Sequence, residues 1–161
     1  MSRPDVLAMP VAGLLSALLA WAAVSDMRVR RIPNLAVLGV LILVVPWLYA
    51  TGLPVVPAVA AGLLALAVGY ILFLFGVLGA GDAKLFSSLA LCAGLAQLPE
   101  LALATALTGG AIAGMYLLFR PRHALVFVQL RGKSGLGPSI PYGVAIAIGG
   151  AFILWSRVMA A

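Results

Sequence analysis

A run of 50 residues without a charged side chain, Ile32–Gly81, is the feature that most constrains this sequence. Three further charge-free runs, Val6–Ser25, Leu101–Phe119 and Ser134–Ser156, hold 20, 19 and 23 residues. A helix needs about 17–25 apolar residues to cross a bilayer, so each run predicts a membrane span and the longest predicts two. We therefore predict an integral membrane protein.

The fold class follows from the membrane. Backbone groups inside a bilayer must be paired within their own segment, which favours helices over open strands. The runs are continuously apolar and lack the two-residue alternation of barrel strands. We predict an all-α, polytopic membrane protein with about six transmembrane helices in one domain, residues 1–161. The expected spans are about 6–25, 35–50, 54–78, 83–98, 101–119 and 136–157.

Several small residues suggest where helices begin, end and meet. Pro33 is expected near the start of the second helix, where a missing N–H is tolerated. The segment 51–54, Thr-Gly-Leu-Pro, predicts a tight turn. Gly-Ala-Gly-Asp at 79–82 should end the third span and offer Asp82 as the N-cap of the fourth. Gly110 and Gly114 form a small-xxx-small pair that suits close helix packing.

The basic residues predict the orientation. Eight of the ten fall in the loops after the first, third and fifth spans or, for Lys84, at the loop end of the fourth span. They are Arg28, Arg30, Arg31, Lys84, Arg120, Arg122, Arg131 and Lys133. With the N-terminus outside, these loops face the cytoplasm, as the positive-inside rule requires. The net charge of +6 then reflects orientation and contact with anionic lipid rather than nucleic-acid binding. The apolar stretch 124–130 is too short to cross and is expected along the interface.

The chain has only four acidic residues, and the predicted spans place each of them on one side of the membrane. Asp26 and Asp82 are separated by two spans and so lie on the same side, whereas Asp5 and Glu100 fall on the other. Ionisable groups at membrane depth are costly and usually functional. Two carboxylates about 3 Å apart share one proton, so one can activate water while the other polarises a carbonyl. Asp26 could otherwise be a juxtamembrane charge answered by nearby arginines, and Asp82 a plain helix cap.

Other catalytic arrangements fit less well. Zinc sites usually need three or four ligands, and the chain has one His and one Cys. A Ser-His-Asp triad would have to use His123, which lies in a basic loop. A catalytic pair of Cys92 and His123 would need the same histidine. Lys84 with Ser87 or Ser88 could share one helical face and form a lysine-activated serine. Serines in membrane helices, however, more often bond their own backbone.

Two functions from other classes are also compatible with the sequence. A small carrier or proton-coupled transporter could use the same two carboxylates to bind a cation. Its carboxylates should then lie nearer the bilayer midplane than predicted span ends. A non-catalytic membrane assembly subunit could also keep such a fold.

Three segments carry recognisable motifs. Residues 26–34 hold an Asp followed by Ile-Pro-Asn, residues 79–84 read Gly-Ala-Gly-Asp-Ala-Lys, and residues 141–143 read Pro-Tyr-Gly. In this order they resemble the motifs of the type IV prepilin peptidases, which are GxGD membrane aspartic peptidases, over nearly the whole chain. The resemblance implies that Asp26 and Asp82 are catalytic. It also implies supporting roles for the other motif residues, Ile32, Pro33, Asn34, Gly79, Gly81, Lys84, Pro141, Tyr142 and Gly143.

The resemblance implies an endopeptidase that removes a basic leader from prepilins or pseudopilins. It would act at the cytoplasmic face of a bacterial or archaeal cytoplasmic membrane, without metal or organic cofactor, with pilin substrates and lipids as partners. Gly79 and Gly81 would let a substrate strand approach Asp82. The chain begins with its first span and has one Cys, so it resembles the short form associated with Flp (Tad-type) pili. N-methyltransferase activity is not expected.

Overall fold

The computed structural model describes residues 3–119 and 142–160, and every long element in these ranges is a helix. The helices are α1 (Arg3–Val29), α2 (Asn34–Thr51), α3 (Val55–Leu74), α4 (Ala80–Phe119) and α6 (Tyr142–Ala160). Each of these five is long and apolar enough to cross a membrane. The prediction of an all-α, multi-pass membrane protein is therefore confirmed.

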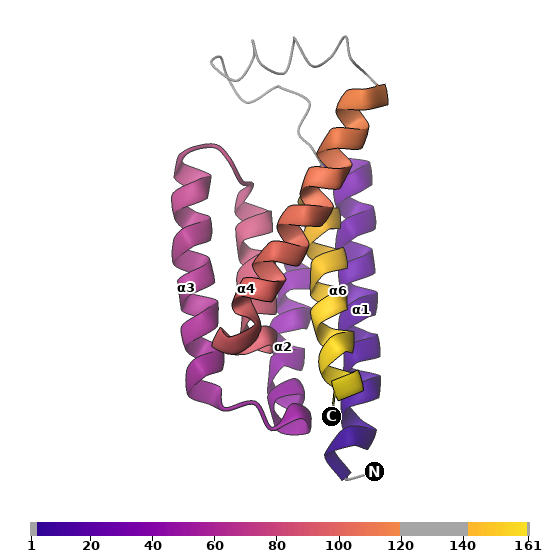
Figure 1. The fold of residues 1–161 in the computed structure, drawn as a ribbon, viewed down its shortest axis with the longest axis vertical. Helices are drawn as coiled ribbons and strands as arrows, with labels where there is room; N and C mark the ends of the chain where they lie inside the picture. Colours follow the sequence, from indigo (N-terminus) through magenta and orange to yellow (C-terminus); the bar gives the residue numbers. More distant parts are fainter. Residues whose placement is uncertain (1–2, 120–141, 161) are drawn as a thin grey trace.

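Helix α4 is two helical limbs joined at Gly94, where the backbone is non-helical with φ 69° and ψ 174°. Such a conformation is essentially restricted to glycine. The chain reverses there, so that residues 80–93 and residues 95–119 run in opposite directions (Figure 1). We refer to these as the first and second limbs of α4. Together with the other four helices they agree with the prediction of about six passes.

The position of this reversal corrects the predicted spans. The sequence suggested a break between spans at residues 98–101, next to Pro99, whereas Pro99 lies within the second limb. Pro99 is the fifth residue of this limb, so its missing N–H removes one intrahelical hydrogen bond, yet the helix continues through it. Gly94 makes the turn instead, and the first limb is only about 21 Å long.

The shorter connections are close to their predicted places. Gly52 caps α2 in the left-handed region at φ 65°, and Pro54 precedes α3 in extended conformation. Pro33 is the N-cap of α2, one residue before the helix begins. Helix α3 ends at Leu74, four residues earlier than predicted, and a turn through Gly76 (φ 67°) leads to α4.

Small residues set the helix contacts, though not all of those predicted. A Cβ at Gly69 would lie 3.0 Å from the Cβ of Ala83, and one at Gly149 would lie 2.9 Å from the backbone nitrogen of Thr105. Helices α3 and α6 therefore touch the two limbs of α4 closely. Gly110 and Gly114 have no described atom within 4 Å of such a Cβ, so they do not pack against a described helix.

The two chain ends lie at one end of the bundle (Figure 1). The opposite end gathers the end of α1, the turn between α3 and α4, and the start of α6. This arrangement brings segments that are far apart in the sequence into one region.

Candidate active site

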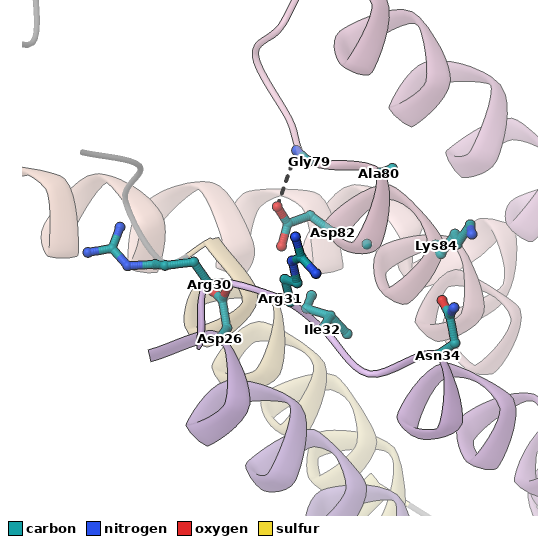
Figure 2. A pocket seen from close by; sticks show the side chains of 10 residues that line it. Asp26, Arg30, Arg31, Ile32, Asn34, Gly79, Ala80, Asp82 and Lys84 are labelled. Atoms are coloured by element: carbon teal, nitrogen blue, oxygen red, sulfur yellow. Dashed lines mark hydrogen bonds between the residues drawn. The ribbon is translucent and has the colours of Figure 1, made fainter. Parts of the chain in front are cut away.

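A pocket of about 350 Å³ opens between the end of α1, the start of α2 and the start of α4 (Figure 2). Both Asp26 and Asp82 line it. The remaining lining residues are Arg30, Arg31, Ile32, Asn34, Gly79, Ala80, Gly81 and Lys84. The same-side placement expected from the count of spans is thus realised as a shared pocket.

Asp26 enters the pocket from the last turns of α1. Its side chain is buried, with 7% of the residue exposed. The backbone N–H of Gly143 donates a buried hydrogen bond of 2.9 Å to Oδ2 of Asp26. Arg30, one helical turn further on, is close enough to act electrostatically on this carboxylate. Asp26 is therefore held from within the bundle, which differs from a surface charge answered only by neighbouring arginines.

Asp82 enters from the first turn of α4 and is half-buried. Its Oδ2 accepts a hydrogen bond of 3.2 Å from the backbone N–H of Gly79. The carbonyl of Gly79 in turn accepts the N–H of Ala83 at 3.0 Å. Gly79 is thus the N-cap and Asp82 the third helical residue reaching back, as in one half of a capping box. The prediction of Asp82 as the N-cap was wrong by three residues, because the helix begins at Ala80.

The two motif glycines are contacted by the protein's own side chains. A Cβ at Gly79 would lie 2.7 Å from Oδ2 of Asp82, and one at Gly81 would lie 3.2 Å from the Cβ of Ile32. Neither glycine has a positive φ. Their small size therefore serves the close packing of the carboxylate and of the loop before α2. Room for a substrate strand remains a prediction.

The Ile-Pro-Asn segment shapes one wall of the pocket. Ile32 packs on Gly81, and the carbonyl of Pro33 accepts the backbone N–H of Ala36 at 3.0 Å to begin α2. Asn34, the first residue of α2, lines the pocket. The loop and the Gly-x-Gly-Asp segment thus dock on each other beside the aspartates.

Sequence reasoning missed the place of two arginines. Arg30 and Arg31 line the pocket, whereas the sequence suggested roles in orientation and lipid contact, or as surface charges answering Asp26. Arg30 has a left-handed φ of 53°, and the Ser25 hydroxyl donates a hydrogen bond of 2.9 Å to the Arg31 carbonyl. Their position between Asp26 and Ile32 was the available signal, since both flanking residues were expected at the site.

The hydrogen bonds of Ser87 and Ser88 do not support the lysine-activated serine. The hydroxyl of Ser87 donates to the carbonyl of Lys84 at 2.9 Å, and the buried hydroxyl of Ser88 donates to the carbonyl of Leu85 at 2.8 Å. Both serines therefore bond their own helix, and the Lys84 side chain is exposed. Cys92 is buried in the bundle.

Some of the sequence predictions lie outside the described residues. These are His123, the stretch 124–130, the start of the span at 136 and Pro141. Tyr142 and Gly143 are described. The Tyr142 ring lies against Gly109 on the second limb of α4, where a Cβ would come within 3.4 Å of the ring.

Comparison with known proteins places this chain in a family. The profile of the type IV leader peptidase family matches residues 13–114, and the chain belongs to that family. The matched range includes Asp26 and Asp82 with their motifs, whereas Gly143 lies beyond it. No curated protein and no solved structure matches the chain. The membership makes the protein a peptidase of the leader-peptidase type.

Proposed function

We propose that the protein is an aspartic endopeptidase that removes the leader from prepilins or pseudopilins, with Asp26 and Asp82 as its catalytic pair. One observation carries the proposal. Two aspartates from helices α1 and α4, in a chain with only four acidic residues, line the same pocket. Family membership supports the peptidase class but does not name the reacting groups.

The chemistry requires the two carboxyl groups to hold one proton between them. The ionised aspartate takes a proton from a water molecule while the protonated one donates a hydrogen bond to the scissile carbonyl oxygen. The water oxygen attacks the carbonyl carbon and forms a tetrahedral intermediate. When the C–N bond breaks, a proton passes to the leaving amine. The products are a leader with a new carboxyl group and a pilin with a new amino terminus.

The proposed orientation places the pocket at the cytoplasmic face. Arg28, Arg30, Arg31 and Lys84 lie at the pocket end of the described bundle, and basic loops favour the cytoplasmic side. A pilin precursor inserted in the same membrane would approach sideways, with its leader at that face. The proposed substrate is a precursor of the Flp type, and the three cationic residues of the pocket are assigned to support and orientation.

Co-expression with an Flp-type prepilin tests the proposal, with intact mass as the readout. Four forms are compared: wild type, Asp26→Asn, Asp82→Asn and the Ser87→Ala/Ser88→Ala double variant. The serine variant is the matched control, because it lies on the same limb of α4 but outside the pocket lining. We expect the leader to be lost with wild type and the serine variant, and kept with either asparagine variant.

Other outcomes separate the alternatives. Cleavage by both asparagine variants would show that the pair is not catalytic. Loss of cleavage only in the serine variant would favour a lysine-activated serine. If no form cuts any of a panel of Flp-type prepilins and pseudopilins, although all four reach the membrane, the proposed substrate class is wrong.

A further inference from the structure

We infer that Gly143, at the start of α6, is a positioning residue for Asp26: its backbone N–H and its lack of a side chain together fix where the carboxylate sits. The inference concerns a residue 117 positions away along the chain and beyond the range that the family profile matches. Its consequence for catalysis rests on the proposed function, whereas its structural part, the placement of the Asp26 carboxylate by Gly143, does not.

The hydrogen bond is the first line of support. The N–H of Gly143 lies in the first turn of α6, where backbone N–H groups have no partner within the helix. Oδ2 of Asp26 accepts it at 2.9 Å, and both residues are buried. Bonds to an ionised carboxylate are among the stronger hydrogen bonds, and a helix N-terminus favours negative charge. The start of α6 is therefore matched to the carboxylate it meets.

The steric fit is the second line of support. A Cβ added at Gly143 would lie 2.9 Å from Oδ2 of Asp26 and 3.0 Å from both its Cβ and its Cγ. The Cβ of Asp26 is attached directly to the backbone of α1, so rotation of the carboxyl group alone does not relieve the overlap. A change of the Asp26 rotamer would not move that Cβ either, so the backbones of α1 and α6 must shift apart locally. Only glycine at 143 keeps the present geometry.

The second aspartate is held in the same way. Oδ2 of Asp82 accepts the N–H of Gly79, as the dashed line in Figure 2 marks. A carboxylate has two oxygens, so one glycine amide on each aspartate leaves the second oxygen for water or the scissile carbonyl. Asp82 receives its amide from its own helix, whereas Asp26 depends on α6. The site is thus built from α1, α4 and the start of α6.

The test uses the purified full-length protein in lipid nanodiscs with an Flp-type prepilin. Gly143→Ala is compared with wild type and with Gly110→Ala, a matched control because a Cβ there meets no described atom. We expect Gly143→Ala to lower kcat roughly 100-fold, the cost of misplacing a reacting group by about 1 Å. KM should stay unchanged, since substrate binding does not use this contact. Gly110→Ala should keep both values.

A second variant guards against simple misfolding. Replacing the Gly143 amide by an ester, through glycolate at that position, removes the N–H and adds no atom. We expect kcat to fall roughly tenfold, because a hydrogen bond to a charged group is lost. A wild-type kcat in both the alanine and the ester forms would overturn the inference.

A third readout does not depend on cleavage. Hydrophobic carbodiimides modify protonated carboxyl groups, and peptide mass spectrometry measures the fraction of Asp26 that has reacted. We expect more modification in Gly143→Ala and in the ester than in wild type or Gly110→Ala. Equal modification in all four would overturn the positioning role. If wild type cuts no prepilin but the modification differs as expected, the proposed function fails and the positioning role stands.

Discussion

At the scale of single residues, the two aspartates reach the pocket by different routes. Asp82 is placed locally, by the start of its own helix and the amide of Gly79. Asp26 is placed by tertiary structure, since its partner Gly143 is 117 residues away. A change in local sequence should therefore disturb Asp82, whereas a change in helix packing should disturb Asp26.

The first prediction concerns the two motif glycines. Gly79→Ala should lower kcat/KM about 10- to 100-fold, because a Cβ there would lie 2.7 Å from Oδ2 of Asp82. Gly81→Ala should have a smaller effect, because its Cβ would meet only Ile32, at 3.2 Å. The measurement is prepilin cleavage by purified variants.

Gly13→Ala is the control for this series, since a Cβ at that helical position meets no described atom within 4 Å. It should cleave as wild type does. An effect of Gly81→Ala larger than that of Gly79→Ala would contradict the assignment of Gly79 to the carboxylate.

The sequence was enough to predict that some residues meet at the site and not enough for others. Counting spans places Asp26 and Asp82 on one side, because two passes always return the chain to its starting face. The bond from Gly143 could not be read in this way, because it depends on which helices become neighbours. The entry of Arg30 and Arg31 into the pocket depends on the turn after α1, where Arg30 takes a left-handed φ that residue type does not predict.

At the scale of secondary structure, the reversal in α4 determines how the bundle closes. A break in a helix frees carbonyl groups that need donors, and inside a membrane such donors must come from the protein. The Trp47 indole donates to the carbonyl of Cys92 at 2.9 Å, and Arg157 donates to the carbonyl of Ala93 at 3.0 Å. Arg157 also donates to Gln97 at 2.8 Å on the far side of the break. Arg157 therefore bridges the two limbs, and the Trp47 bond ties the first limb to α2.

The second prediction follows from this contact. Arg157→Met should lower the free energy of unfolding by about 1.5–3 kcal/mol, because hydrogen bonds from a charged group are lost. The change should be measured by reversible unfolding in mixed detergent micelles. Arg28→Met is the control, since Arg28 is exposed at the end of α1. Equal stability of Arg157→Met and wild type would mean that the arginine does not support the reversal.

The positions of the helices were easier to predict than their contacts. Charge-free runs give the spans because each pass must be apolar. The break at Gly94 was missed because an isolated glycine inside an apolar run is a weak helix-breaking signal. Gly110 and Gly114 have the spacing of a packing pair, but spacing does not say which face meets a neighbour.

At the scale of the whole molecule, the helix ends that line the pocket lie at the opposite end of the bundle from the chain ends (Figure 1). Both termini at one end require an even number of passes. Five spanning helices supply this only if α4 reverses, as the backbone at Gly94 allows. Arg157 lies at the end away from the pocket and bonds the reversal, which explains a basic residue on the side that the charge distribution disfavours.

The third prediction is the orientation in the membrane. In a Cys92→Ser background, single cysteines are placed at exposed positions, Arg28→Cys near the pocket and Val55→Cys after the turn between α2 and α3. An impermeant thiol reagent added to intact cells should label position 55 and not position 28. Permeabilised cells should show both. Labelling at 28 alone would reverse the orientation and place the pocket outside.

The central claim is that Asp26 and Asp82 act as one catalytic unit. The most direct measurement is kcat/KM for prepilin cleavage by Asp26→Asn, Asp82→Asn and the double variant, all purified in nanodiscs. General acid–base groups contribute about 10²- to 10⁴-fold to the rate, so kcat/KM of each single variant should fall at least about 100-fold. Residues that act as a unit are strongly non-additive, so the double variant should lose no more than the worse single variant. A double variant whose loss equals the product of the two single losses, or a single variant with wild-type activity, would contradict the account.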